Sequence, residues 1–204
     1  MNGLGRVMLL ALMCVLMASP ADDYDLDTLA RDFWAWRATN QPFSGDDIPR
    51  LDRPAGWQAD WSPAAFAARR QAIIEFEARW KKLDASAWPV PRQVDRRLMG
   101  SAIERVRWEL EVVRAWRRNP LFYIDQTLAA VHSLLLQPPP FDADRSAEII
   151  RRLESIPETL THARANLDQT AGPFARLAIE ELSDVRGRMA IVARECIEII
   201  SGNR

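Results

Sequence analysis

The sequence predicts an all-α fold of about seven helices in antiparallel pairs, an irregular helical bundle. Apolar residues recur at helical spacing along most of the 204 residues, and no segment alternates apolar and polar residues as a half-buried strand does. Prolines divide the periodic segments into lengths that fit single helices. These observations together favour helices packed on helices around one hydrophobic core.

The first half of the chain is expected to contain two helices and a long loop. A first helix fits Leu26 to about Thr39, and its apolar face carries Leu29, Phe33 and Trp36. Residues 40–61 are interrupted by prolines and glycines, so we expect an ordered loop. Its anchors are Phe43, Trp57 and Trp61. Ser62-Pro63 then starts a helix, because the hydroxyl can cap and proline suits the first turn. This helix runs to about Leu83 with a buried stripe of Phe66, Ile73, Phe76, Trp80 and Leu83.

The longest helix is expected over residues 92–117, with apolar residues on two sides. One stripe is Val94, Leu98, Ala102, Val106, Leu110 and Val113, and the other is Trp108, Val112 and Trp116. Pro120 starts the next helix, whose apolar positions are Ile124, Leu128, Val131 and Leu135, and the three prolines at 138–140 end it. Two short helices follow at about 144–154 and 157–167, separated before Pro157.

The last helix is expected from Pro173 to about Ile200, ending before Gly202. Its apolar positions alternate by four and three residues, which is typical of an antiparallel coiled-coil-like seam. The seam consists of Ala178, Leu182, Val185, Met189, Val192, Cys196 and Ile199. We therefore interpret Cys196 as a buried thiol, with a reactive thiol as the alternative.

The first 21 residues are interpreted as a signal peptide, and residues 22–204 as the helical domain. Arg6 precedes an apolar run over residues 7–17, which is too short to span a bilayer, and Ser19-Pro20-Ala21 offers a cleavage site after Ala21. The alternatives are an uncleaved anchor or a lipid attached at Cys14, although the large residue before Cys14 does not suit lipid attachment. We expect an exported protein, periplasmic or secreted, without a stable membrane span after cleavage.

The charge balance gives no reason to expect a nucleic-acid partner. The chain has 27 Lys and Arg residues against 28 Asp and Glu residues, and binding to backbone phosphates needs a basic surplus. A triad has no support either, since His132 and Ser133 are only sequence neighbours.

Three segments resemble a known family. They are the segment from Glu104 to Asp125 with its two Trp and five Arg, Pro138-Pro139-Pro140-Phe141, and residues 151–167. Together they resemble the N-terminal helical region of a bacterial family catalogued as domain of unknown function 885, which is similar to zincin-type metallopeptidases. The resemblance implies an exported, zinc-dependent hydrolase acting on peptides, with its metal motif, a His-Glu pair followed by Gly-His-His, further downstream.

That metal motif is absent from this sequence. His132 and His162 are its two histidines, and neither has a second histidine one turn away, so we expect no metal ligands and no catalytic residue in this chain. Zinc is expected only in a C-terminal part of the larger protein. We interpret His132 as an interior histidine, with a site residue as the alternative, and His162 as solvent-facing.

Two functions of different class remain open. The chain is either the N-terminal scaffold and substrate-cleft wall of a peptidase-like protein, inactive alone, or a self-sufficient periplasmic binding or interaction module. The candidate cleft residues are Trp108, Glu111, Arg114, Tyr123 and Asp125. Arg107, Glu111 and Arg114 are spaced for ion pairs within one helix, which is the structural alternative. We also expect self-association through an exposed apolar surface around Trp108 and Trp116.

Overall fold

The computed structural model describes residues 20–43, 53–54, 56–135, 142–185 and 187, and these residues form helices and no strand. The predicted all-α fold is confirmed. The elements in chain order are α1 (Pro20–Asn40), α2 (Pro63–Lys81), α3 (Val90–Trp108), the π-helix η1 (Glu109–Val113), α4 (Ala115–Arg118), α5 (Leu121–Ile124), the π-helix η2 (Asp125–Ala129), α6 (Ala130–Leu135) and α7 (Ala143–Asn166). Residues 172–185 form a further helix.

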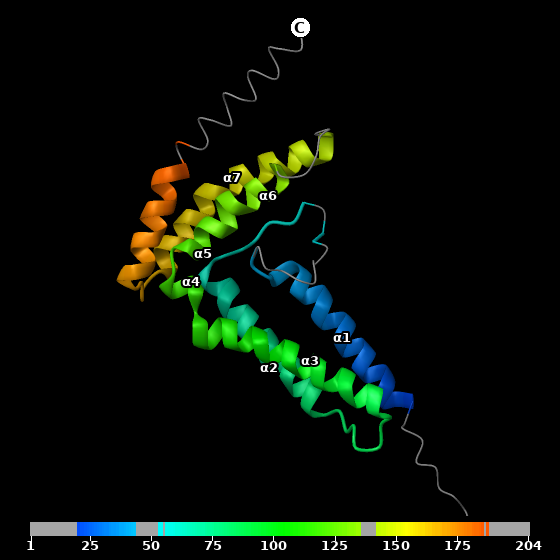
Figure 1. Cartoon of the computed structure of the whole chain (residues 1–204). Helices are drawn as coiled ribbons and strands as arrows, with labels where there is room; N and C mark the ends of the chain where they lie inside the picture. The colour runs from blue at the N-terminus through cyan, green and yellow to red at the C-terminus, as the bar shows by residue number, and fades with distance from the viewer. Residues whose placement is uncertain (1–19, 44–52, 55, 136–141, 186, 188–204) are drawn as a thin grey trace, which may run out of the picture.

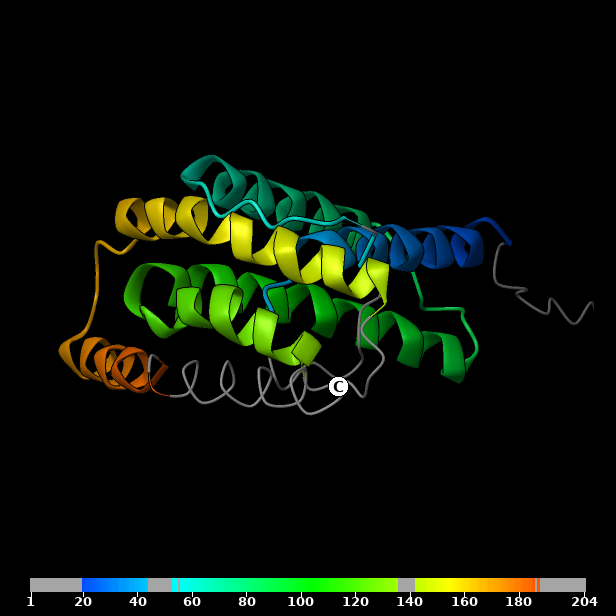
Figure 2. The same cartoon turned by 90° about the horizontal axis from the view of Figure 1, so that it is seen from above.

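The helices form two groups that cross each other in Figure 1. In the first group α2 packs against both α1 and α3. In the second, α5, η2 and α6 follow one another as a rod that packs along α7. Figure 2 shows from above how α7 also lies next to the first group, and α7 has contacts with α2, α4 and α5.

The start and the buried face of α2 follow the prediction. The Ser62 hydroxyl accepts a hydrogen bond from the Ala65 amide at 3.1 Å, and Pro63 occupies the first turn. Phe66, Ile73, Phe76 and Leu83 are buried, and Trp80 is partly buried. The anchoring of the loop before α2 is also confirmed for two residues. Trp57 donates its indole N–H to the Thr39 carbonyl at 2.7 Å, and Trp61 is 1% exposed in the core.

The prediction for α3 is wrong in its register. Val94 and Leu98 are exposed, whereas Met99, Ile103, Val106 and Leu110 form the buried face. These four residues have the same four-three-four spacing, so periodicity alone could not distinguish the two neighbouring faces.

The expected continuous helix over residues 92–117 is also interrupted. The α-helix ends at Trp108 and gives way to η1, and Arg114 then has a left-handed backbone with φ of 49°. Non-glycine residues seldom adopt this conformation, and it ends the helical path here.

The break expected before Pro157 is absent, because Pro157 lies inside α7. A proline removes one main-chain hydrogen bond from a helix. Here α7 packs against η2, α6 and the first group along its length, and these contacts keep the helix continuous. The expected last helix is present over residues 172–185, with Ala178 buried and Leu182 exposed. The rest of its seam, including Cys196, and most of the signal segment lie outside the described residues.

Trp116 belongs to the core and not to an exposed surface, which corrects part of the self-association hypothesis. It is 8% exposed, whereas Trp108 is 52% exposed and Val112 57% exposed. None of the described helices combines the length and apolar character needed to cross a bilayer.

Candidate functional site

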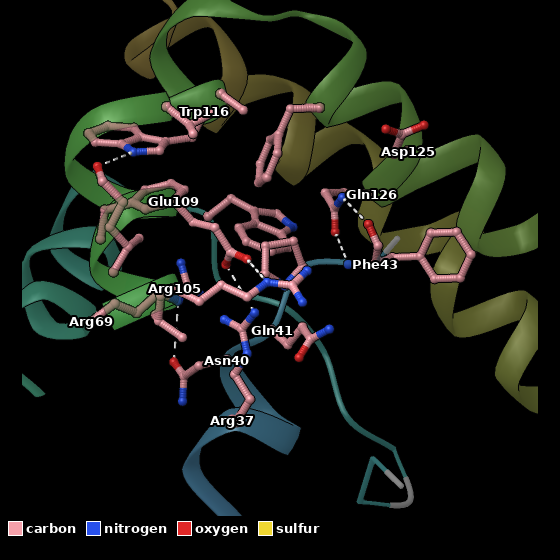
Figure 3. Close-up of a pocket in the computed structure, with 18 of the residues that line it drawn as sticks. Arg37, Asn40, Gln41, Phe43, Arg69, Arg105, Glu109, Trp116, Asp125 and Gln126 are labelled. Atoms are coloured by element: carbon pink, nitrogen blue, oxygen red, sulfur yellow. Dashed lines mark hydrogen bonds and ion pairs between the residues drawn. The ribbon is translucent and has the colours of Figure 1, made fainter. Parts of the chain in front are cut away.

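A partly open cavity of about 240 Å³ lies where the first helix group meets η1, α4, α5 and η2. Figure 3 shows the polar side chains that point toward it. Its polar lining consists of Arg37, Asn40, Gln41, Arg69, Arg105, Glu109, Asp125 and Gln126. Its apolar lining includes Trp36, Phe43, Trp61, Phe66, Trp116 and Phe122. The cavity thus combines aromatic walls with several charged groups, as small-molecule sites do.

Both π-helical segments contribute side chains to this cavity. Glu109 and Leu110 come from η1, and Asp125 and Gln126 come from η2. A π-helix changes the direction in which successive side chains point, and single π-helical turns are frequent at functional sites. The strained Arg114 directly follows η1. Irregular backbone therefore concentrates around this one cavity.

Glu109 forms the centre of an ion-pair cluster in the cavity wall. Its Oε2 accepts a hydrogen bond from Arg37 Nη2 at 2.9 Å, and its Oε1 accepts one from Arg105 Nε at 3.0 Å (Figure 3). The Arg37 side chain is 8% exposed and that of Glu109 is 30% exposed. This pair is therefore more strongly shielded from solvent than an ordinary surface salt bridge.

Arg69 is a buried cation on the same cavity. Its Nε donates to Asn40 Oδ1 at 3.2 Å and its Nη2 donates to the Asp60 carbonyl at 2.6 Å. Burial lowers the pKa of Arg69 to about 10, against the opposing effect of Asp60, so the guanidinium stays charged at neutral pH. Arg69 is 5% exposed, and its Nη1 has no hydrogen-bond partner among the described residues. Such an unpaired buried donor is uncommon in a folded protein.

Aromatic rings form the deep side of the cavity. Phe66 and Trp116 stack with their ring centroids 4.2 Å apart, and Phe122 meets Trp61 edge-on at 5.2 Å. The Arg69 guanidinium lies over the Trp61 ring at 4.7 Å, a distance that suits cation–π attraction.

Gln126 ties the start of the long loop to η2. Its Oε1 accepts a hydrogen bond from the Phe43 amide at 2.6 Å, and its Nε2 donates to the Phe43 carbonyl at 3.0 Å (Figure 3). One side-chain amide thus satisfies both main-chain groups of Phe43. This contact fixes the rim of the cavity.

The structure does not bring the five candidate cleft residues together. Asp125 lines the cavity. Trp108 and Glu111 lie on exposed positions, and Arg114 is partly buried with its Nε unpaired among the described residues. Tyr123 is 2% exposed and belongs to the core, where its hydroxyl donates to the Trp116 carbonyl at 2.8 Å.

The alternative of ion pairs within one helix is wrong for Arg107, Glu111 and Arg114. Arg107 instead pairs with Glu104 at 2.6 Å. The reason is the π-helical segment and the left-handed Arg114, which remove the regular spacing that the ion pairs would need.

Sequence reasoning missed Arg37, Arg69, Arg105, Glu109 and Gln126 as cavity residues. One signal was available. Arg69 falls between Phe66 and Ile73 on the apolar face of α2, and a charged residue in a buried stripe indicates a paired or functional group. Nothing comparable marked Arg37 or Glu109, which are 72 positions apart in the chain.

A second, largely apolar cavity of about 490 Å³ lies between the rod of α5, η2 and α6, α7 and the helix over residues 172–185. Asp125, His132 and Glu181 are its titratable residues. Burial, with a smaller contribution from Glu181, raises the pKa of Asp125. The prediction that His132 is interior is wrong, because η2 shifts the register and Val131 takes the buried position while His132 is exposed.

Among the described residues, no group of three or more His, Cys, Asp or Glu side chains is placed to hold a metal ion. These residues therefore do not fit a zinc site of the kind that metallopeptidases use.

Comparison with known proteins gives one family. No curated protein and no solved structure matches the chain. Residues 46–195 match the family described as "Bacterial protein of unknown function (DUF885)". This match covers more than half of the 204 residues and includes the second, third and later helices that enclose the cavity. The chain therefore belongs to the bacterial DUF885 family.

Proposed function

We propose that this chain forms a helical wall of the substrate-binding cleft in an exported, zinc-peptidase-like protein. The peptidase part of the proposal rests on the resemblance described for residues 104–125, 138–141 and 151–167. Export rests on Arg6, the apolar run over residues 7–17 and the small residues before Asp22.

The observation that carries the binding role is the cavity around Glu109. It offers aromatic walls for apolar side chains, and guanidinium and amide groups for the polar ends of a peptide. Two π-helical segments and the strained Arg114 surround it, and such irregular backbone clusters at binding and catalytic sites.

In this proposal the residues of the cavity bind and orient a substrate and do not cleave it. The described residues have no arrangement that suits a metal, and Glu109 is engaged by two arginines, so it is not free to act as a general base. Any zinc would be held by the downstream His-Glu and Gly-His-His motif of the family, which this sequence lacks.

A self-sufficient binding module remains the alternative. The favouring observation is that residues of this chain alone line the cavity on several sides, from α1 to η2. Both hypotheses require ligand binding, and they differ in whether a peptidase part acts on the same ligand.

Peptide binding without cleavage tests the proposal. Short apolar peptides should quench or shift the tryptophan fluorescence of the purified chain, because Trp36, Trp61 and Trp116 line the cavity. Mass spectrometry should find the peptides intact with and without added zinc. Hydrolysis that depends on His132 or His162, or complete absence of peptide binding, would contradict the proposal.

A further inference from the structure

Cations outnumber anions in the lining of the Glu109 cavity. Arg37, Arg69 and Arg105 line it, and Glu109 is their shared interior counter-ion. Asp125 is the other lining carboxylate. It is exposed and contacts the second cavity as well. The interior of the cavity therefore has a positive surplus.

Glu109 occupies the position where an external carboxylate would bind. Each of its two oxygens accepts a hydrogen bond from a different guanidinium, at 2.9 Å from Arg37 and at 3.0 Å from Arg105. Arginine has five N–H donors, so this single carboxylate uses only a part of what the two side chains offer. A ligand carboxylate at this place would compete with Glu109 for the same cations.

Arg69 adds a donor that the protein itself leaves unused. Its other two nitrogens are held by Asn40 and by the Asp60 carbonyl, whereas Nη1 is buried and has no partner among the described residues. Leaving a buried donor of a charged group unpaired costs free energy, and an acceptor supplied by a ligand would recover it. Arg69 is held in place by the Trp61 and Phe66 rings, so its guanidinium is already oriented.

The size and walls of the cavity limit what else the ligand contains. A volume of about 240 Å³ is below the usual range for drug-sized ligands, roughly 300–1,000 Å³, and suits one amino-acid residue. The stacked Phe66 and Trp116 rings offer an apolar surface to a side chain.

We propose that this cavity binds the terminal carboxylate of a short peptide whose last side chain is apolar, with Arg37, Arg69 and Arg105 as the anion-binding groups. This inference names the ligand of the proposed substrate-binding wall and rests on that function. Glu109 is the internal anion that the ligand carboxylate displaces from the arginines, and it lowers affinity in the wild-type protein.

The test compares two ligands that differ only in the terminal charge. Acetyl-alanyl-leucine and its C-terminal amide are titrated into the full chain, with binding followed by calorimetry. Charge-assisted hydrogen bonds contribute about 1.5–3 kcal/mol, so the acid should bind roughly ten- to hundredfold more tightly than the amide. Equal binding of acid and amide would overturn the carboxylate assignment and leave the peptide-binding function standing, whereas binding of neither would overturn both.

The Glu109→Gln variant gives a result that a purely structural role would not. It removes the competing charge and keeps the shape, so affinity for the acid should rise several-fold while affinity for the amide stays the same. The matched control is Glu111→Gln, which removes the same charge from an exposed position outside the cavity and should change neither affinity. Unchanged or weaker binding of the acid by Glu109→Gln would overturn the proposal.

Two further measurements complete the test. Arg105→Gln replaces a largely exposed side chain, so the variant should fold, and its affinity for the acid should fall toward that for the amide. Retained affinity would contradict the assignment. Inorganic sulfate should displace the peptide only weakly. Displacement as strong as that by the acid itself would show a site for any anion and would overturn the assignment to a peptide end.

Discussion

Replacing Gly100 by alanine should destabilise the protein, although alanine favours a helix more than glycine does. Gly100 lies inside α3, where this exchange by itself stabilises a helix by about 0.8–1 kcal/mol. A Cβ at this position would lie 2.6 Å from Trp80 Cζ2 and 2.7 Å from Cε2, whereas ordinary contacts begin at 3.4 Å. The ring would therefore have to withdraw by 0.8 Å, the difference between 3.4 and 2.6 Å.

Withdrawal of the Trp80 ring costs more than the helix gains. The indole N–H donates to the Arg96 carbonyl at 2.8 Å and the Arg96 guanidinium lies over the ring at 4.5 Å. Crowding of this kind costs about 1–3 kcal/mol, and loss of the hydrogen bond costs about 0.5–1.5 kcal/mol. After subtraction of the helix gain, the free energy of unfolding should fall by about 1–3 kcal/mol.

Urea denaturation followed by far-ultraviolet circular dichroism measures the change. Gly172→Ala is the matched control, because no atom lies within 4 Å of a Cβ there, and it should not be destabilised. In a Trp80→Leu background the crowding is relieved, so Gly100→Ala should become neutral or stabilising. If Gly100→Ala were as stable as the wild type, or equally destabilised in both backgrounds, the contact with Trp80 would not be its cause.

Three further predictions concern single side chains. Tyr123→Phe removes a buried hydroxyl that accepts from Asn166 at 2.9 Å and donates to a main-chain carbonyl at 2.8 Å, so urea denaturation should show a loss of about 1–3 kcal/mol; an unchanged midpoint would contradict the network. Because burial and Glu181 raise the pKa of Asp125 in the folded state, its charged form destabilises the fold, and stability is lost as the pH rises through the folded pKa. Asp125→Asn should therefore be more stable than the wild type at neutral pH and lose that advantage below about pH 4, near the unfolded pKa, and an advantage that persists in acid would contradict the assignment. Trp108→Gln should weaken concentration-dependent association in sedimentation experiments, since Trp108 is 52% exposed, and a wild type that stays monomeric would exclude association through this surface.

The sequence was sufficient to predict the class of the fold and several helix boundaries. Ser62-Pro63 marks the start of α2 because the cap and the first-turn proline are local features. Pro157 shows the limit of such signals. Its local preference predicts a break, but packing along α7 outweighs it, and that packing depends on residues far away in the chain.

The cavity was harder to predict than the fold. Five-residue π-helical segments are too short to change the apolar period visibly, and no glycine marks the left-handed position of Arg114. Glu109 and Arg37 meet because α1 crosses the end of α3, which the spacing of residues within either helix does not specify. Of the charged residues in the cavity, Arg69 alone carried a sequence signal, its position in an apolar stripe.

Each π-helical segment can be regarded as an α-helix that has received one additional residue. The Arg114 amide bonds to the Glu109 carbonyl at 3.0 Å, five positions back rather than four. One residue corresponds to a rotation of about 100° and a rise of about 1.5 Å in an α-helix. Deletion of a single residue from η1, such as the exposed Val112, would thus let the helix return to the regular period and turn everything that follows by more than a quarter of a circle. Trp116 and Phe66 could then no longer stack, so the length of this short segment, more than the chemistry of its side chains, sets where the cavity can form.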